Sequence, residues 1–336
     1  MARIKDVANR AGVSSATVSR VLNGDGRVAT ASRERVLAAV RELGYSPNRI
    51  ARNLRRQQTE TIGVVVSDIE NPHFTQAVRR IENAAYDRGY RVLLCNTDES
   101  PEKQRAYLEM LAAERVRGVI LVPADATDSM IGQLVGIGIP VVALDRGVDH
   151  PQADAVIADN HHAAKRAVKH LHDIGRQRIG CIAGRPEIQT GRERLAGYLD
   201  GVDEIHGTPR WADGMFRVEG GRVATKRLLE DAADIDGLLV ANNLMAIGAL
   251  STLRELGRSV GQDIGVVSFD DPVWAAFVDP PLTVMAQPVR RMADQAIDLL
   301  FERIEGTRAQ ARTVVFNFEL IVRSSCGVAS TSLGER

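Results

Sequence analysis

Charged, amide and aromatic residues that could together bind a small hydroxylated molecule follow several short apolar runs of the chain. Asp145-Arg146 follows residues 141–144, and Asp270 follows residues 265–269. Carboxylates accept hydrogen bonds from pairs of hydroxyls, guanidinium and amide groups donate to hydroxyl and ring oxygens, and aromatic faces stack on C–H surfaces. We therefore predict a ligand site made of Asn71, His73, Phe74, Asp145, Arg146, Thr190, Arg194, Phe216, Asn242, Asp270 and Gln287.

Each of these residues also has a purely structural interpretation when it is considered alone. Asp270 could cap the next element, and Asp145 and Arg146 could form an ion pair. Phe74 and Phe216 could belong to the core, as most aromatic residues do. The set indicates a site because its members follow successive strands.

The elements that would hold these residues alternate between short apolar strands and amphipathic helices. Strands are expected at residues 62–66, 91–95, 118–122, 141–144, 156–158, 179–183, 238–241, 265–269, 283–286, 313–316 and 320–322. Helices are expected at residues 75–88, 101–114, 128–137, 161–174, 192–205, 221–230, 243–255 and 289–304. This alternation is typical of parallel sheets covered by helices, which bind ligands beyond the carboxyl ends of their strands. Two such sets predict an α/β body of two lobes with a cleft between them.

The first 47 residues show a different, all-α pattern. Apolar spacing predicts a helix over residues 4–11, which Gly12 ends, and a second helix that Ser14 caps. A third helix is expected to begin at a Thr30 cap and to close at Gly44. Three short helices with a tight turn predict a helix-turn-helix head, whose second helix lies in the DNA major groove.

A neutral total charge conceals a basic N-terminal segment on an acidic remainder. Residues 1–58 hold 12 Lys and Arg against four Asp and Glu, a net charge of +8. The full chain has 43 residues of each sign, so residues 59–336 carry a net charge of −8. A basic segment is typical of a module that binds DNA phosphates. The alternative interpretation is a solvated helical hairpin whose charges have no partner.

Several classes of protein are disfavoured by what the sequence lacks. No GxGxxG motif follows residues 62–66, no GxxxxGK[ST] motif occurs, and no Ser or Cys has an obvious base, so we expect neither an enzyme nor a cofactor. Cys95, Cys181 and Cys326 lack metal-ligand spacing, so buried thiols are expected rather than a metal site or disulfides. No run approaches about 18 apolar residues, and the N-terminus is charged, so we expect a cytoplasmic protein without a membrane partner.

Four segments of the N-terminal region resemble the DNA-binding head of the lactose-repressor (LacI/GalR) family. They are Ile4-Lys5-Asp6-Val7-Ala8, Ala11-Gly12-Val13-Ser14, Ala16-Thr17-Val18-Ser19-Arg20-Val21-Leu22-Asn23 and Leu43-Gly44-Tyr45-Ser46-Pro47-Asn48. The similarity continues through the body to about Arg323, and the body also resembles the periplasmic ribose-type sugar-binding proteins. The resemblance implies a homodimeric repressor that binds a pseudo-palindromic operator in double-stranded DNA under the control of a small-molecule effector. A solute-binding protein, the alternative, would leave the head unexplained.

The resemblance also indicates which residues contact DNA. The second helix would present Ser15, Ala16 and Arg20 to base edges in the major groove. Residues 48–56 would form a hinge helix that orders on DNA, with Leu54 of each subunit wedged into a base step of the minor groove. A flexible basic linker is the other interpretation of that segment. The predicted DNA-binding residues are Ser14, Ser15, Ala16, Thr17, Ser19, Arg20, Asn23, Arg27, Tyr45, Ala51, Leu54 and Arg55.

The domain boundaries follow from these assignments. We predict a head at residues 1–47, a hinge at 48–58, an effector-binding and dimerisation domain at 59–325, and a disordered tail at 326–336. The first lobe is expected to comprise residues 59–159 and 288–306, and the second lobe 160–287 and 307–323. The chain is expected to cross between the lobes near residues 158–160, 240–243 and 286–288.

The sequence leaves the effector open. The cleft positions are similar to those that hold pentose in the ribose-binding branch, so a pentose-like sugar is expected. His73 stands in Asn-Pro-His-Phe where the family usually has Asn-Pro-Phe-Phe, which argues against ribose itself and permits a larger or more polar ligand. A purine stacked on Phe74 and Phe216, or a sugar phosphate, is the alternative. Whether the effector releases or strengthens DNA binding, and whether a phosphocarrier protein takes part, also stays open.

Overall fold

The computed structural model describes residues 3–22, 28–45 and 59–327, and the chain divides into two compact units, residues 1–59 and 60–336. The first unit holds the predicted head, and the second holds the predicted α/β body.

The head consists of three helices, α1 (Ile4–Ala11), α2 (Ser15–Leu22) and α3 (Thr30–Glu42). Their apolar faces form one small core around Val7, Val18 and Val36, all of which are fully buried. Gly12 ends α1 with a left-handed φ of 64°, which a residue with a side chain rarely adopts.

One of the two predicted caps of the head is confirmed and the other is wrong. The Ser14 hydroxyl accepts a hydrogen bond of 3.1 Å from the backbone N–H of Thr17, as a cap of α2 does. Thr30 does not cap α3, because it is already the first helical residue and the preceding Ala29 offers no side-chain oxygen.

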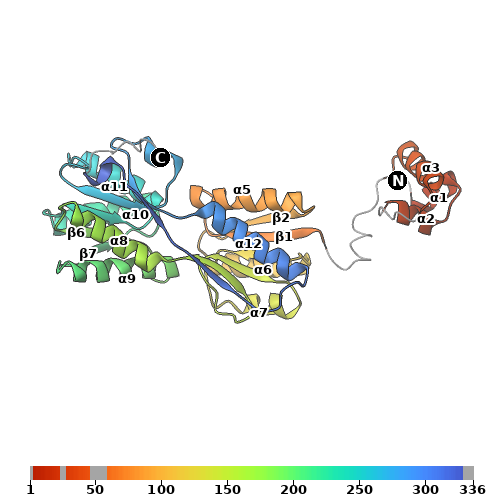
Figure 1. Ribbon diagram of the computed structural model, residues 1–336, viewed down its shortest axis with the longest axis horizontal. Coiled ribbons are helices and arrows are strands. Elements are labelled where there is room, and N and C mark those ends of the chain that lie inside the picture. Colours follow the sequence, from red (N-terminus) through yellow and green to blue (C-terminus); the bar gives the residue numbers. More distant parts are fainter. Residues whose placement is uncertain (1–2, 23–27, 46–58, 328–336) are drawn as a thin grey trace, which may run out of the picture. The chain divides into compact units, whose positions relative to one another are not determined.

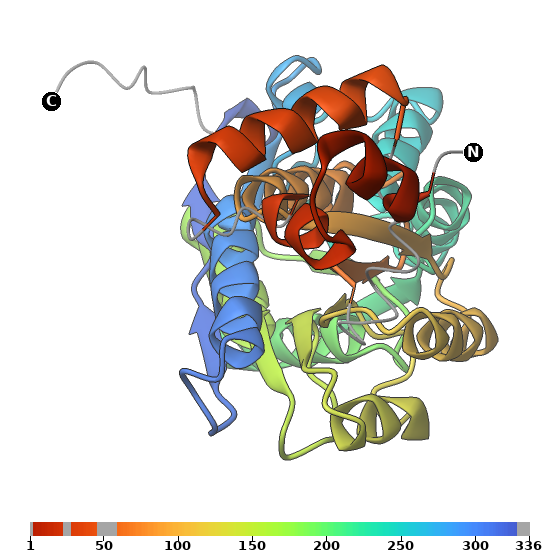
Figure 2. The ribbon, with the colours of Figure 1, turned by 90° about the vertical axis from the view of Figure 1, so that its right-hand side faces the viewer.

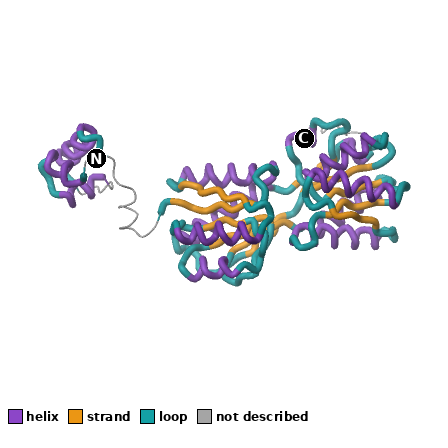
Figure 3. Tube along the Cα trace, turned by 180° about the vertical axis from the view of Figure 1, so that it is seen from behind, coloured by secondary structure: helices purple, strands orange, loops and turns teal. Residues whose placement is uncertain are grey.

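The body contains two six-stranded sheets, each in the centre of one lobe with helices outside it (Figures 1 and 3). The first sheet has the order β11-β5-β4-β3-β1-β2 and is parallel throughout. The second has the order β12-β10-β9-β8-β6-β7, in which only β12 is antiparallel to its neighbour. The first sheet's strands are β1 (Thr61–Val66), β2 (Arg91–Asn96), β3 (Val119–Leu121), β4 (Val141–Asp145), β5 (Asp154–Ala158) and β11 (Thr313–Phe316). The second sheet's strands are β6 (Ile179–Ala183), β7 (Arg210–Asp213), β8 (Gly237–Val240), β9 (Gly265–Phe269), β10 (Thr283–Ala286) and β12 (Glu319–Ile321).

Helices cover both faces of each sheet, which is why the central strands are apolar along their whole length. In the first lobe α12 packs against α5 on one side of the sheet, with α6 and α7 on the other (Figure 2). In the second lobe the helices pack as the pairs α8–α9 and α10–α11. Their bounds are α5 (Pro72–Asp87), α6 (Pro101–Ala113), α7 (Ser129–Gly136), α8 (Asn160–Asp173), α9 (Gln189–Glu204), α10 (Val218–Asp231), α11 (Asn243–Glu255) and α12 (Val289–Ile304).

Two of the three predicted crossings between the lobes are confirmed and one is wrong. The chain leaves the first sheet after β5 and returns from β10 to α12, at the predicted residues 158–160 and 286–288. Residues 240–243 do not cross, because β8 and the following α11 both belong to the second lobe. The third crossing lies between β11 and β12.

The assignment of residues 307–323 to the second lobe is therefore wrong for β11. This strand pairs with β5 in the first sheet, where the buried carboxylate of Asp154 holds the segment that precedes it. Asp154 accepts hydrogen bonds from Arg303 at 2.9 Å, from Arg308 at 2.7 Å and from the backbone N–H of Arg312 at 2.7 Å. One carboxylate thus joins the end of α12 to the start of β11.

The C-terminal boundary and one strand also differ from the sequence prediction. Of the tail expected to be disordered at 326–336, Cys326 is buried at the end of a 3₁₀ turn (η2, Ser324–Cys326), in which the Ser325 hydroxyl donates a hydrogen bond to the Val266 carbonyl at 2.7 Å, and residues 328–336 lie outside the described residues. Strand β7 was not predicted. The three cysteines are buried free thiols, as expected. No helix in the described part of the chain is long and apolar enough to cross a membrane.

We predict that Asp154→Ala lowers the free energy of unfolding by about 3–5 kcal/mol, because Arg303 and Arg308 lose their shared buried carboxylate. Urea unfolding of the full chain, followed by circular dichroism, measures this. Asp173→Ala is the control, since it removes only an exposed ion pair to Lys169 and should cost less than about 1 kcal/mol. Equal losses in the two variants would contradict the structural role of Asp154.

Candidate functional site

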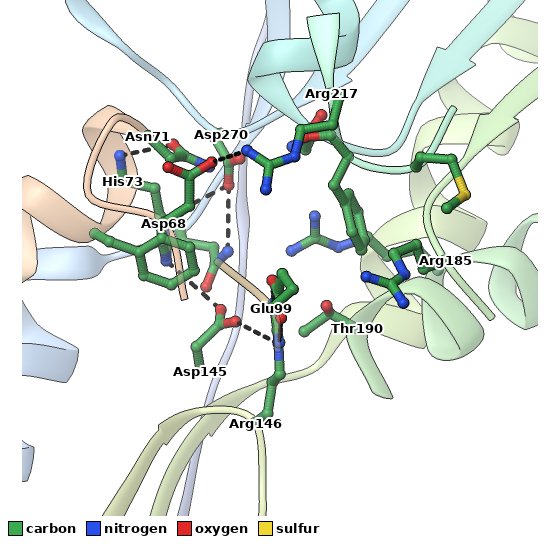
Figure 4. Close-up of a pocket in the computed structure, with 16 residues that line it drawn as sticks. Asp68, Asn71, His73, Glu99, Asp145, Arg146, Arg185, Thr190, Arg217 and Asp270 are labelled. Atoms are coloured by element: carbon green, nitrogen blue, oxygen red, sulfur yellow. Dashed lines mark hydrogen bonds and ion pairs between the residues drawn. The ribbon is translucent and has the colours of Figure 1, made fainter. Parts of the chain in front are cut away.

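One pocket of about 530 Å³, open solvent included, is lined by residues of both lobes (Figure 4). The structure brings all eleven predicted ligand residues together in its wall: Asn71, His73, Phe74, Asp145, Arg146, Thr190, Arg194, Phe216, Asn242, Asp270 and Gln287. Five lining residues were absent from the predicted set: Asp68, Glu99, Arg185, Met215 and Arg217.

Most of the pocket wall comes from the segments in which strands end. The other lining residues come from the starts of α5 and α9. Because neighbouring parallel strands end at the same edge of a sheet, each lobe presents a row of such segments to the pocket. The strands that end in lining residues, or are followed closely by them, are β1, β2 and β4 in the first sheet and β6, β7, β8, β9 and β10 in the second.

The backbone turns sharply where several of these strands end. Of the eight non-glycine residues with positive φ in the described part of the chain, five line the pocket. A left-handed backbone at such residues costs roughly 1–3 kcal/mol and is typical of ligand sites. Asp145 and Asp270, one from each lobe, both have a φ of 70°. The other three are Glu99, Met215 and Phe216.

His73, in the first turn of α5, lies between two carboxylates of different lobes. Its Nε2 atom is 3.5 Å from Oδ1 of Asp145, and its Nδ1 atom is 3.7 Å from Oδ1 of Asp270. Burial lowers the pKa of His73, but the hydrogen bond to Asp145 and the charges of both carboxylates outweigh it, so the pKa lies above 6.5. Burial likewise opposes ionisation of Asp145, yet the hydrogen bond and charge of His73 lower the pKa of that carboxyl to about 2. Protonated His73 therefore attracts the carboxylates of Asp145 in the first lobe and Asp270 in the second.

Three direct bonds also join the lobes around the pocket. Arg217 Nη1 donates to Oδ2 of Asp68 at 3.0 Å. Asn243 Nδ2 donates to Oδ1 of Asn71 at 2.9 Å. The backbone N–H of Gly147 donates to Oε1 of Gln189 at 2.7 Å. Of the residues in these bonds, Asp68, Asn71 and Arg217 line the pocket, so a ligand there lies beside contacts that join the lobes.

Arg146 makes its strongest contacts within the first lobe. Two of its guanidinium nitrogens donate to the two oxygens of Glu99, each at 2.7 Å, and one also donates to the carbonyl of Pro123 at 3.1 Å. Its Nε atom is 3.4 Å from Oδ2 of Asp145. The structural interpretation of Arg146 as an ion-pair residue therefore describes its present contacts, with Glu99 as the main partner.

Asn242 and Phe216 are fixed by local structure. Asn242 caps α11, because its side chain accepts a hydrogen bond of 2.8 Å from the backbone N–H of Met245. The ring of Phe216 packs directly on Gly184, where an added Cβ would lie 2.0 Å from the ring. Phe216 thus presents an aromatic face to the pocket only because position 184 is a glycine.

The sequence held a signal for some of the five missed residues and not for others. Asp68 and Glu99 follow strands that were predicted, so the strand-end argument would have included them. Met215 and Arg217 follow β7, which the sequence did not reveal. Arg185 follows the predicted strand β6 by two residues, so the same strand-end argument would have included it.

On the head, α2 carries the predicted base-reading residues on its exposed side. Ala16 and Arg20 are exposed, whereas Val18 and Val21 are buried against the other helices. Ser14, Ser15, Thr17 and Ser19 lie in or just before α2, and Tyr45 follows α3. Asn23, Arg27, Ala51, Leu54 and Arg55 lie outside the described residues.

The side chains that line the pocket suit the binding of a small polar molecule. Among the described residues, no group of three or more His, Cys, Asp and Glu side chains is placed to hold a metal ion. The pocket instead offers carboxylates, guanidinium groups and two aromatic rings to a small polar molecule.

Two family models match the chain. Residues 3–48 match the model described as "Bacterial regulatory proteins, lacI family", and residues 168–326 match the "Periplasmic binding protein-like domain".

Whole-length relatives agree with both matches. The chain is 35% identical over 329 residues to the HTH-type transcriptional repressor PurR of Aliivibrio salmonicida, and the aligned region covers 97% of this chain and 99% of that protein. The structure of this chain is similar to that of the lac repressor dimer bound to operator and the anti-inducer ONPF, with 30% identity and a TM-score of 0.87. That alignment covers 97% of this chain and 99% of the lac repressor chain. The structure of this chain is also similar to a complex of the transcriptional regulator CelR with cellobiose, with 32% identity, a TM-score of 0.74 and coverage of 97% and 100%.

We predict that His73 stabilises the fold at low pH and loses this effect as the pH rises. Because the pKa of His73 is raised on folding, its contribution is fully present below about pH 6.5 and disappears through the higher folded-state pKa, at about 1.4 kcal/mol for each pKa unit. The difference in unfolding free energy between wild type and His73→Gln should therefore shrink between pH 6 and pH 9.

Urea unfolding across this range measures that difference. His161→Gln is the control, since this half-exposed histidine pairs with an exposed carboxylate, Asp200. A His73 effect that stays constant with pH would show that the imidazole acts without its charge.

Proposed function

The chain belongs to the lacI family of bacterial regulatory proteins, and we propose that a small polar effector in the interlobe pocket controls its binding to operator DNA. As a member of this family it is a transcriptional repressor and not an enzyme. The proposal includes a homodimer that acts on a pseudo-palindromic operator in the cytoplasm, with a head at residues 1–47, a hinge at 48–58 and the effector domain at 59–325.

The observation that carries the proposal is the composition of the pocket wall. Asp145 of the first lobe and Asp270 of the second approach the same imidazole, that of His73, from opposite lobes. A ligand that contacts both carboxylates exchanges the present interlobe contacts for its own, and it thereby changes the relative stability of lobe arrangements. This gives the effector the differential affinity that control of a second site requires.

We propose a sugar, pentose-like in size, as the effector. Carboxylates that accept from hydroxyl pairs and the aromatic rings of Phe74 and Phe216 suit a polyhydroxylated ring. A purine, which the same two rings could stack on, is the competing ligand. We expect a stronger response to sugars because two carboxylates, those of Asp145 and Asp270, line the pocket as hydrogen-bond acceptors for hydroxyls.

On the DNA side, we propose that α2 of each head enters the major groove. The hinge would fold only when two copies meet over the operator, because about nine residues are too few for a stable isolated helix. Lobe rearrangement would set whether the two hinges can meet, so the hinge would be the element that both sites influence.

We predict that a screen of pentoses, hexoses, sugar phosphates and purines finds one of these four classes whose members raise the melting temperature of the protein. A ligand at 100 times its dissociation constant adds about 2.7 kcal/mol of stability. Asp270→Asn should weaken that ligand about 10- to 150-fold in calorimetry, through loss of a charged hydrogen-bond partner, and should leave operator binding without ligand unchanged.

Asp271→Asn is the matched control, because Asp271 pairs with Arg323 and does not line the pocket. If Asp270→Asn bound the ligand normally, the effector site would have to lie elsewhere. A response to purines alone would replace the sugar by the competing ligand.

We predict that Arg20→Ala weakens binding to the preferred operator by about 1–3 kcal/mol and relaxes the preference at one base pair of each half-site. Arg20 is the exposed arginine of α2, whose guanidinium can donate two hydrogen bonds to a guanine. Mobility-shift titration against single-base operator variants measures the effect.

Arg10→Ala serves as the control for this prediction, because Arg10 is paired with Glu42 on the surface of the head. If Arg20→Ala weakened binding to all sequences equally, Arg20 would contact a phosphate rather than a base.

A further inference from the structure

One corner of the pocket carries a positive charge that is only weakly paired. Arg185 lines the pocket, its guanidinium makes no hydrogen bond to any described residue, and its Nε atom is buried without a hydrogen-bond partner. Its ion pair with Glu187 spans 3.9 Å, and the Glu187 side chain is 71% exposed. A pair of this length with a solvated carboxylate holds an arginine weakly.

Arg194 is a second cation in the same pocket, and it forms no ion pair with a described residue. It is only 4% exposed, and its hydrogen bonds go to two neutral oxygens, Oδ1 of Asn160 and the carbonyl of Ala241. Burial lowers the pKa of Arg194 more than the charges of Asp270 and Asp145 raise it. A buried guanidinium in this position is stabilised by any anion that comes close.

The start of α9 adds backbone donors to this corner. No side chain caps the helix, and the residue before it is Ile188. Its positive end therefore remains open to an anionic partner. Gly191 allows the first turn to lie against the carbonyl of Arg185, since an added Cβ would be 2.2 Å from that oxygen. The loop and the helix start are thus held together.

Thr190 is the independent sign that this corner receives a ligand. It is 3% exposed, it lines the pocket, and its hydroxyl has no hydrogen-bond partner among the described residues. Figure 4 shows Thr190 and Arg185 on the same side of the pocket, away from Asn71, His73 and Asp68. A hydroxyl that lines a pocket without a partner in the protein can donate to a ligand and accept from it.

We propose that the effector carries an anionic group, a phosphate or a carboxylate, which binds at the start of α9 to Arg185, Thr190 and Arg194. This rests on the proposed function, because it assigns a chemical class to the ligand of the same pocket. The hydroxyl-bearing part of the ligand lies toward Asp145 and Asp270, where carboxylates accept hydrogen bonds and would repel an anion. The effector is then a sugar phosphate or a sugar acid rather than a neutral sugar.

Calorimetry with matched ligands on the full chain tests this. The probes are D-ribose against D-ribose 5-phosphate, and D-glucose against D-glucose 6-phosphate and D-gluconate, at constant ionic strength. In at least one set the anionic member should bind about 10-fold or more tightly than its neutral partner, and the phosphate and gluconate arms distinguish the two anions. Inorganic phosphate, compared with chloride, should also raise the melting temperature.

Three variants locate the effect. Arg185→Gln should lower the affinity for the anionic member about 10-fold more than the affinity for its neutral partner, so that the advantage and the response to phosphate are lost. Thr190→Val, which keeps the side-chain volume, should reduce the same advantage. Arg192→Gln, an exposed arginine of the same helix start, should keep it.

Each other outcome contradicts a stated claim. Neutral sugars that bind as tightly as their anionic partners would overturn the anionic class and leave the proposed function intact. Equal losses in Arg185→Gln and Arg192→Gln would show a general effect of positive charge and overturn the assignment of the anionic group to Arg185. If no probe of either kind bound to a chain that still binds operator DNA, the effector pocket of the proposed function would fail together with this inference.

Discussion

Parallel strands that end at a common cleft are the constraint on which the rest of the body depends. Each lobe buries its strands under helices on both faces, so polar residues concentrate where the strands end. The chain crosses between the lobes three times, after β5, after β10 and after β11. These connections keep the two rows of strand ends opposite each other, and a pocket of mixed charge between them follows.

The pocket is costly to the fold, as ligand sites commonly are. Asp145 and Asp270 have left-handed backbones, and Arg194 is a buried cation whose hydrogen bonds go to neutral oxygens. In the structure the lobes offset part of this cost by contacts with each other, which include the hydrogen bond between Arg217 and Asp68 and the approach of His73 to Asp270. A ligand that replaces those contacts acts on the equilibrium between lobe arrangements, which is the physical basis of the control proposed here.

Some arginines of the pocket are paired with carboxylates, whereas those near the start of α9 are weakly paired or unpaired. Arg146 and Arg217 are paired with Glu99 and Asp68, so their guanidinium groups are largely satisfied. Near α9 the pairing is incomplete, and this asymmetry, rather than the net charge of the pocket, indicates an anionic effector. Arg185 lines the pocket with a guanidinium that makes no hydrogen bond to a described residue and only a long ion pair with Glu187.

The sequence alone determined the three-helix head, the two α/β sets and the eleven residues that meet in the pocket, because helix and strand periodicity and strand-end positions are local properties. It did not determine which sheet β11 joins, where the third crossing lies, or the short strand β7. Those depend on distant partners, such as the contacts of Asp154 with Arg303 and Arg308. Only the tertiary structure decided that Arg146 pairs with Glu99 and that Arg185 faces the pocket, since side-chain partners are chosen by spatial proximity that the linear spacing does not encode.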